Sequence, residues 1–377
     1  MTGDERAEFW RARATNEDDA AALTAYARSG FEAAAFERGA DCPLPDEPFV
    51  AAWERYIEVA RVVGAARSLK RALMQLRFPI AEGTSADPAY LAAVRRGAWR
   101  GDPDTAGIRF SRPDDLRIFM HATAAGRVPV VAAGAREDFV ALVQALTCRN
   151  EPRPVPDAMG ACIVAGYNNW ERIAALGPMF AGATLDKSQY QDRFIVLSSG
   201  PYSGVPAADV GVAADEWLRQ SVTIRLEHEC AHYVTRQVLD AMRNSMLDEV
   251  IADYIGIVAA AGRYHAAWFL RFVGLDADGA CRADGRIHTY RGTPPLPDTA
   301  FAVLQDVVRQ AAAQLEAFDR TCRHSTLTPI ETARTIVALA RVGLEGLASD
   351  SAPDRIRAAV ADAARIIRAR APFPSIA

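Results

Sequence analysis

The chain has 377 residues, half of them hydrophobic and 24% charged, which is typical of a folded protein with a large core. Its formal net charge of −4 argues against a nucleic-acid-binding protein, which would usually carry a basic surplus. No stretch approaches the roughly 18 to 20 apolar residues of a membrane helix, and the acidic N-terminal segment is unlike a secretory signal. We therefore expect a cytoplasmic protein without nucleic-acid or membrane partners. The six cysteines contain no C-x-x-C pair, which favours reduced thiols.

Residues 1–110 are expected to form a helical N-terminal region. Ala-rich segments at 18–38 and 47–76 have helical periodicity and are separated by the breaker GADCPLPDEP. A further short helix is expected over Pro88–Arg96.

Residues 111–275 are expected to form the core, because both strand and helix patterns occur there. Short apolar runs predict strands at 116–120, 128–132, 161–165 and 193–197, with an amphipathic helix at 138–147. The pattern then becomes helical, over 215–242, Met246–Ala261 and 264–272. The predicted fold class is therefore α+β and mainly helical.

Residues 276–377 are expected to form a loop and a helical C-terminal region. The loop at 276–297 is too long for a simple connection, and loops of this length are usually functional or mobile. Helices are predicted over 299–318, Pro329–Leu347 and 353–370.

The segment LEHECAH contains candidate metal-binding and catalytic residues, because His228, Glu229 and His232 form an H-E-x-x-H motif. Histidines four residues apart on a helix point the same way and can reach one ion. Glu229 lies at the edge of that face, where it can accept a proton from a water activated by zinc. A catalytic zinc needs a third protein ligand, and Glu249 on the next predicted helix can supply it. Asp253, four residues later, lies on the same face.

The two motifs together resemble those of the gluzincin metallopeptidases, in which H-E-x-x-H is followed, after a turn, by a helix with E-x-x-x-D. The resemblance covers residues 228–253. It implies one Zn²⁺ held by His228, His232 and Glu249, with Asp253 orienting His228. It also implies a zincin-like core with a small mixed sheet beside the H-E-x-x-H helix. The aminopeptidase motif G-x-M-E-N is absent, so an exopeptidase would lack its usual amine anchor.

Other candidate site residues lie outside the two motifs. His288 or Tyr290, in the long loop, could stabilise the oxyanion opposite the metal. Arg286 and Arg291 could hold a substrate carboxylate. Tyr202 follows the strand at 193–197 and is a further substrate-binding candidate. An exposed loop without any of these roles remains an alternative.

The sequence thus predicts a zinc-dependent hydrolase, most simply a metallopeptidase, that cleaves a peptide or small amide by water attack with Glu229 as the general base. One alternative is the same site acting on a non-peptide metabolite, as in a tailoring reaction. Another is a metal-binding scaffold without peptidase activity, and a third is two ordinary helix histidines with Glu249 in a salt bridge. The side-chain preference, the oligomeric state and the choice between zinc and another divalent metal stay open.

Overall fold

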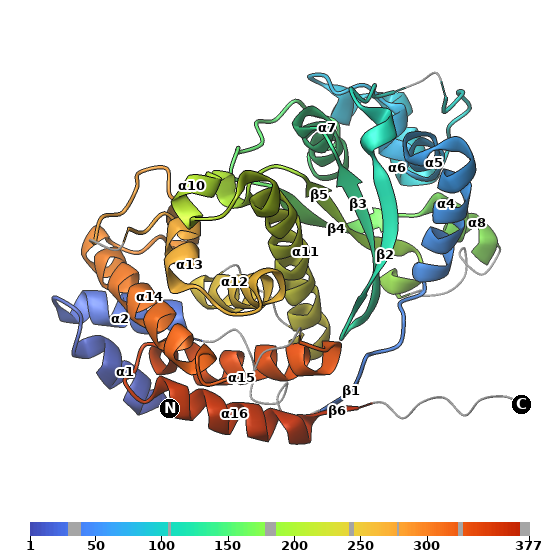
Figure 1. Cartoon of the computed structure of the whole chain (residues 1–377). Coiled ribbons are helices and arrows are strands. Elements are labelled where there is room, and N and C mark those ends of the chain that lie inside the picture. The colour runs from blue at the N-terminus through green and yellow to red at the C-terminus, as the bar shows by residue number, and fades with distance from the viewer. Residues whose placement is uncertain are drawn as a thin grey trace, which may run out of the picture. The chain divides into compact units, whose positions relative to one another are not determined.

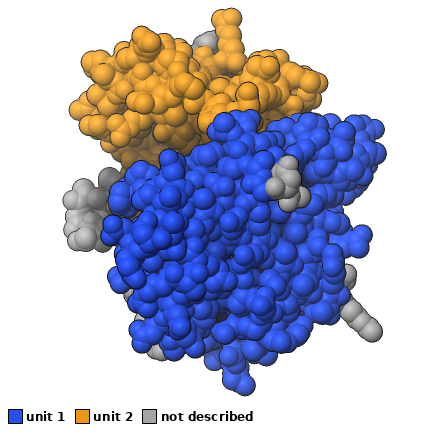
Figure 2. Space-filling view, turned by 90° about the vertical axis from the view of Figure 1, so that its left-hand side faces the viewer, with its two compact units in different colours: residues 1–44, 201–377 blue, residues 45–200 orange. Residues whose placement is uncertain are grey.

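The computed structural model describes residues 1–28, 39–104, 107–177, 186–240, 245–276, 279–322 and 327–369. The chain divides into two compact units, coloured separately in Figure 2: unit 1 comprises Met1–Leu44 and Pro201–Ala377, and unit 2 comprises Pro45–Gly200. This division differs from the three regions expected above, since residues 111–200 and the H-E-x-x-H helix fall in different units. The expected regions and the placement of the sheet beside that helix therefore stay predictions. The mainly helical α+β class is confirmed.

Unit 2 is built on a mixed four-stranded sheet with the order β2-β3-β5-β4, in which only β3 and β5 are parallel. All four strands were expected from the sequence, and each is slightly longer than predicted. The helices α4 and α7 pack on the sheet, with Trp53, Phe139 and Phe194 buried in the core. The bounds are β2 (Arg117–Thr123), β3 (Gly126–Ala133), β4 (Ala161–Asn168), β5 (Gln191–Ser198), α4 (Val50–Val63) and α7 (Arg136–Thr147).

The single helix predicted over 47–76 is wrong. It is interrupted at Gly64, whose φ of 87° is left-handed and cannot continue a helix, so α4 ends there and α5 (Ala65–Ala72) begins. The short helix predicted over Pro88–Arg96 is confirmed as α6. The remaining short elements are η1 (Met74–Arg77), η2 (Thr84–Ala86), η3 (Pro113–Asp115), α8 (Trp170–Leu176) and η4 (Lys187–Gln189).

Unit 1 is helical, with α12 inside it between α11 and α15 (Figure 1). The helices α14, α15 and α16 pack against one another, and α2 packs on α14 and α15. The bounds are α1 (Gly3–Arg11), α2 (Glu17–Ala27), η5 (Tyr202–Gly204), α10 (Ala207–Val210), α11 (Ala214–Leu239), α12 (Met246–Ala261), α13 (Ala266–Val273), η6 (Arg286–Tyr290), α14 (Asp298–Asp319), α15 (Pro329–Leu347) and α16 (Ala352–Ile366). The helices predicted in this part are confirmed, except for the end of the last one; the segments 29–38, 241–242 and 370 lie outside the described residues.

The C-terminal helix ends earlier than residue 370, its predicted last residue. It stops at Ile366, and β6 (Ile367–Ala369) pairs in parallel with β1 (Ala40–Cys42). A partner more than 300 residues away leaves no trace in local periodicity, which explains the error. None of the described helices is long and apolar enough to cross a membrane, and the six cysteines are free thiols.

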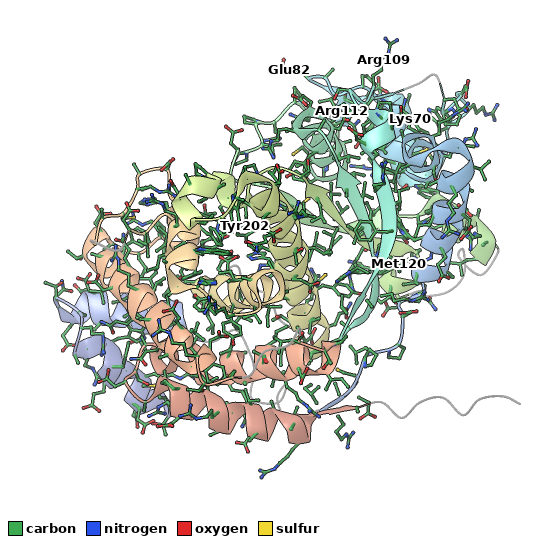
Figure 3. All side chains as sticks on the ribbon, in the orientation of Figure 1. Lys70, Glu82, Arg109, Arg112, Met120 and Tyr202 are labelled. Carbon is green, nitrogen blue, oxygen red and sulfur yellow. The ribbon has the colours of Figure 1, made fainter. Side chains whose placement is uncertain are left out.

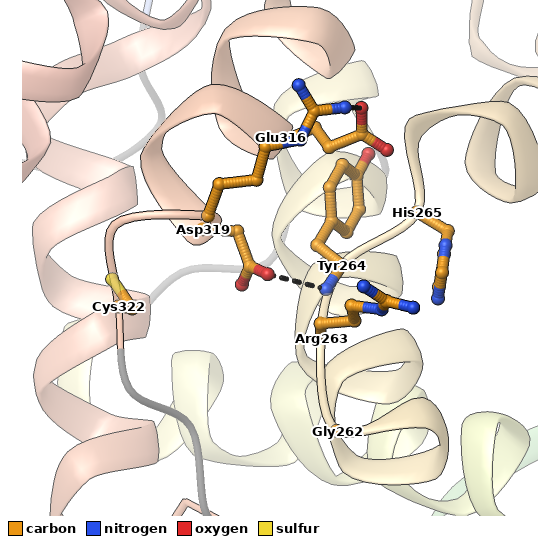
Figure 4. Close-up of a pocket in the computed structure, with 8 residues that line it drawn as sticks. Gly262, Arg263, Tyr264, His265, Glu316, Asp319 and Cys322 are labelled. Carbon is orange, nitrogen blue, oxygen red and sulfur yellow. Dashed lines mark hydrogen bonds and ion pairs between the residues drawn. The ribbon is translucent and has the colours of Figure 1, made fainter.

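The helix α12 is fixed at both of its ends. It begins with a capping box in which Ser245 and Asp248 satisfy each other's backbone amides, and it ends at the left-handed Gly262. Near its C-terminal end, the Asp319 carboxylate of α14 accepts hydrogen bonds from the Tyr254 hydroxyl and the Tyr264 amide. Figure 4 shows the second of these bonds.

A glycine lets α12 approach α11 closely. A Cβ on Gly256 would lie 2.6 Å from the backbone oxygen of Ile224, so only glycine fits this crossing. Glu249, Asp253 and Gly256 are spaced four and three residues apart and share one face of α12. The close crossing therefore brings the two carboxylates to the H-E-x-x-H helix.

Candidate metal centre

His228 and His232 from α11 meet Glu249 from α12 in a buried group, which we call the His-His-Glu cluster. The His228 and His232 Nε2 atoms face each other at 3.1 Å. The Glu249 carboxylate lies 3.4 Å from His232 Nε2 and 3.7 Å from His228 Nε2. One ligand atom from each residue lies within 4.8 Å of the others, so the cluster could hold a metal ion.

The donor set fits a divalent ion in charge and spacing. Two ligand atoms about 2.0 to 2.1 Å from a tetrahedral ion are about 3.3 to 3.4 Å apart, and the three distances of 3.1, 3.4 and 3.7 Å scatter around that value. No described residue donates a hydrogen bond to Glu249 Oε2, although this oxygen is buried. This carboxylate oxygen therefore remains available as a ligand for a cation.

Without an ion, charge within the cluster shifts the pKa values of its members. Burial would lower the pKa of His232, but the hydrogen bond and charge of Glu249 raise it to about 9. Burial would raise the pKa of Glu249, yet His232, His228 and Arg286 bring it far below its usual value. At neutral pH these shifts favour a protonated His232 beside an ionised Glu249.

Asp253 lies behind His228, away from the cluster. Its Oδ1 is 2.7 Å from His228 Nδ1, which places a hydrogen on Nδ1 and leaves the Nε2 lone pair free to bind. The guanidinium of Arg286 donates to the other oxygen of Asp253 and lies 3.7 Å from Glu249 Oε2. Burial would raise the pKa of Asp253, but the charges of Arg286 and His228 lower it. The carboxylate is therefore ionised and holds the imidazole in one orientation.

Tyr202 also belongs to this support. Its hydroxyl donates to Asp253 Oδ1 at 2.5 Å and lies 3.0 Å from His228 Nδ1. Figure 3 shows Tyr202 among α11, α12 and α13. The residue is buried, so these contacts give it and Arg286 a role behind the ligand. The assignment of both to substrate binding stays a prediction.

Glu229 differs from the ligands because no described residue hydrogen-bonds its carboxylate. It is partly buried beside His228. Burial raises its pKa above the usual value, against the opposing charges of His228 and His232. Such a carboxylate suits a proton acceptor more than a structural ion pair.

The long loop brings only some of its candidates to the cluster. The pKa of Tyr290 is raised by burial and, against the charge of Arg286, by the Glu249 carboxylate, so its hydroxyl lies close to the ligands. His288 is exposed, and its ring nitrogen lies 3.0 Å from the Arg282 carbonyl. Arg291 bonds Leu296 O in the loop and Asp298 at the start of α14, and it stacks on Phe301. Tyr290 and Arg286 are thus at the site, whereas His288 and Arg291 have partners elsewhere.

One residue at the site was missed by the sequence analysis. The hydroxyl of Tyr26, on α2, donates to the Tyr290 backbone oxygen at 2.8 Å and accepts from the Met246 amide at 3.1 Å. It ties η6 to the first residue of α12. No local pattern signals this contact, because Tyr26 is an isolated aromatic residue in an Ala-rich helix.

A second hollow in unit 1 involves none of the cluster residues. It has a volume of about 620 Å³ and lies where α12 and α14 end, lined by Arg263, His265 and Asp319 among others (Figure 4). Glu316 and Arg320 on its wall pair with each other. None of its lining residues belongs to a group of described side chains that could hold a metal ion.

Comparison with known proteins gives a family but no characterised relative. No curated protein and no solved structure matches the chain. A family of unknown function, DUF7005, matches residues 9–351, which include both motifs and η6. The match spans most of the chain, and the protein therefore belongs to the DUF7005 family.

Proposed function

We propose that this protein is a metal-dependent hydrolase in which His228, His232 and Glu249 hold one Zn²⁺ and Glu229 is the general base. The observation that carries the proposal is the buried His-His-Glu cluster, with two Nε2 atoms facing each other at 3.1 Å and a carboxylate oxygen without a donor. An ordinary buried polar group would be satisfied by its neighbours. The gluzincin resemblance of the two motifs supports the same assignment and a zincin-like arrangement of the core.

The protein's own groups divide the reaction between them. A divalent ion in this cluster supplies a Lewis acid that polarises a carbonyl and acidifies water. Glu229 accepts the proton of the attacking water and returns it to the leaving amine. Its raised pKa suits this exchange, because a base works best when its pKa is near the working pH. Asp253 keeps the His228 lone pair directed at the ion.

Tyr290 is the proposed oxyanion stabiliser. Its hydroxyl lies near Glu249 on a loop that Tyr26 ties to α12, and its raised pKa keeps it protonated as a donor. His288, the other candidate, has its ring nitrogen at the Arg282 carbonyl. The substrate is a peptide or a small amide, because these are the bonds that such a site hydrolyses in the proteins it resembles.

The test is the metal content of the purified protein and the turnover of Glu229→Gln. We expect about one Zn²⁺ per chain in both proteins, and a loss of about 10²- to 10⁴-fold in hydrolysis of peptides or small amides in the variant. Glu216→Gln is the matched control, because Glu216 is a partly exposed glutamate on the same helix that pairs with Arg219. It should change neither quantity.

The outcome separates the alternatives. Turnover of a non-peptide metabolite, with no turnover of peptide libraries or small amides, would assign the site to a tailoring reaction. Bound zinc with no turnover in the wild type would indicate a scaffold. A wild-type protein that binds no divalent metal would refute the proposal.

A further inference from the structure

The position of Tyr202 is fixed by an unusual amount of local structure. It begins the one-turn element η5, where Ser203 has a left-handed φ of 50° that a serine rarely adopts. Its amide donates to Ser221 Oγ at 3.0 Å, and its ring packs edge-on against Phe272 at 4.8 Å. The Arg225 guanidinium also holds the preceding carbonyl, that of Pro201, at 2.9 Å. Uncommon backbone geometry persists only where the surroundings require it, so the fold commits several residues to aiming this ring.

The ring is aimed at the carboxylate that orients His228. Asp253 Oδ1 accepts from both the Tyr202 hydroxyl, at 2.5 Å, and His228 Nδ1, at 2.7 Å. Arg286 Nη1 donates to the Tyr202 oxygen at 3.3 Å, and another nitrogen of the same guanidinium donates to Asp253 Oδ2. Because Arg286 donates to the Tyr202 oxygen, the hydroxyl hydrogen of Tyr202 points to Asp253. Tyr202 thus holds one Asp253 oxygen and Arg286 holds the other, both independently of the hydrogen bond to His228. The carboxylate therefore cannot rotate.

The other tautomer of His228 is unfavourable in this setting. With the hydrogen on Nε2, the Nδ1 lone pair would face the ionised Asp253 oxygen at 2.7 Å. If Oδ1 were free to turn away, that penalty would fall. The Tyr202 hydroxyl removes this freedom, because it keeps Oδ1 in place.

We propose that Tyr202 is a positioning residue for the metal, which fixes Asp253 so that His228 is held with its Nε2 lone pair toward the ion. This inference rests on the metal site of the proposed function and adds a residue to it. The Tyr202 hydroxyl touches no ligand atom of the cluster, and it acts through Asp253 and His228 Nδ1. Partners of metal-ligating histidines commonly contribute about 10- to 100-fold to metal affinity.

The experiment measures the Zn²⁺ affinity of the full chain by competition with a chromophoric chelator. We expect Tyr202→Phe to bind about tenfold more weakly and Asp253→Asn about 10- to 100-fold more weakly. The matched control is Tyr254→Phe, which removes another buried tyrosine hydroxyl from the same unit, one whose partner is Asp319. It should lose stability without losing zinc affinity, which separates positioning from general destabilisation.

The outcomes distinguish this inference from the function on which it rests. Wild-type protein that binds no Zn²⁺ refutes the metal site itself. Wild-type binding with Tyr202→Phe within twofold of it, both folded by circular dichroism, overturns only the role of Tyr202. Should Tyr202→Phe fail to fold, NMR of the wild type still decides. We expect a slowly exchanging Tyr202 hydroxyl proton with a nuclear Overhauser effect to the His228 Nδ1 proton, and exchange at the bulk rate would overturn the proposal.

Discussion

Two buried aspartates, one in each unit, each accept hydrogen bonds from three polar side chains. In unit 2, Asp192 on β5 accepts hydrogen bonds from Trp53 Nε1 at 2.9 Å, Asn169 Nδ2 at 2.7 Å and Arg172 Nη1 at 2.5 Å. In unit 1, Asp253 accepts from a tyrosine, a histidine and an arginine. Both carboxylates are fully buried. The two aspartates are alike in their burial and in their number of donors. The groups therefore differ in the further contacts that the donor residues make.

The partners of Asp192 are satisfied by one another and by the backbone. Arg172 also donates to the carbonyls of Ser188 and Gln189, and Asn169 bonds Tyr56. The group around Asp253 instead continues through His228 to the His-His-Glu cluster, where Glu249 Oε2 accepts no hydrogen bond from the described residues. A closed network stabilises a fold, whereas a buried carboxylate oxygen that accepts no hydrogen bond remains available as a ligand for a cation. This contrast, more than burial or charge alone, marks the site.

The pKa values follow the same division. Burial raises the pKa of Asp192 despite its hydrogen bonds. The pKa of Asp253 is lowered, because the charges of Arg286 and His228 overcome burial. A lowered pKa contributes stability above the unfolded value, near 3.9, that is lost as the pH falls through the folded value. The Asp253 group should therefore weaken in acid, while the Asp192 carboxyl tolerates protonation better.

The largest expected effect is the loss of metal from His232→Ala. Removing one of three protein ligands should reduce bound Zn²⁺ from about one ion per chain to trace levels, measured by mass spectrometry of the dialysed protein. His265→Ala is the control, because His265 stacks on Trp268 and lies outside the cluster. Stoichiometric zinc in His232→Ala would show that the His-His-Glu cluster is not the metal site.

The closed network should respond in stability and not in metal content. Arg172→Ala leaves Asp192 buried without its charge partner, and we expect a loss of about 3 to 5 kcal/mol in the free energy of unfolding, measured in urea. Zinc content should stay at the wild-type value. A variant that loses metal while keeping its stability would mean that the two groups had been assigned the wrong way round.

A change at the crossing of α11 and α12 should affect both the stability and the zinc affinity. Gly256→Ala forces a methyl group onto the Ile224 carbonyl, and overpacking of this kind costs about 1 to 3 kcal/mol. Because the crossing also sets the distance between α11 and α12, zinc affinity should fall with stability. Gly3→Ala is the control, since a Cβ there meets no atom within 4 Å. An unaffected affinity in folded Gly256→Ala would show that the crossing does not set the ligand spacing.

The last expected effect is a dependence of metal affinity on pH. The His232 pKa is raised to about 9, so an ion must displace a proton at neutral pH, and affinity should rise by up to about tenfold per pH unit below that value. Stability of the metal-free protein should change in the opposite sense. A histidine with a raised folded pKa contributes below its unfolded value, near 6.5, and that contribution disappears as the pH rises toward 9. Chelator competition at pH 6, 7 and 8 tests this, and a constant affinity would contradict it.

The residues at the site differ in how far the sequence could predict them. His228, Glu229 and His232 lie on one helical turn, and Glu249 and Asp253 on another, so spacing alone grouped each set. Tyr290 and Arg286 were named from a long loop without a way to separate them from His288 and Arg291. Tyr26 could not be found, because its two hydrogen bonds reach residues 264 and 220 positions away.

The fold shows the same limit at several places. The four strands of the sheet were predictable, since alternation and short apolar runs are local. The break at Gly64 and the strand Ile367–Ala369 were not, because a left-handed glycine and a distant strand partner leave helical periodicity intact.

The sequence by itself determined the helical character of the chain, the four strands of its sheet and two motifs that each present candidate metal ligands on one helix face. Side chains four residues apart meet whatever else the chain does, so these conclusions needed no tertiary information. Only the tertiary structure decided that the two faces meet at Gly256. It also decided that Tyr202 and Arg286 hold Asp253, and that Glu249 Oε2 accepts no hydrogen bond from the described residues. Those features depend on the packing of segments far apart in the chain, which local periodicity cannot specify.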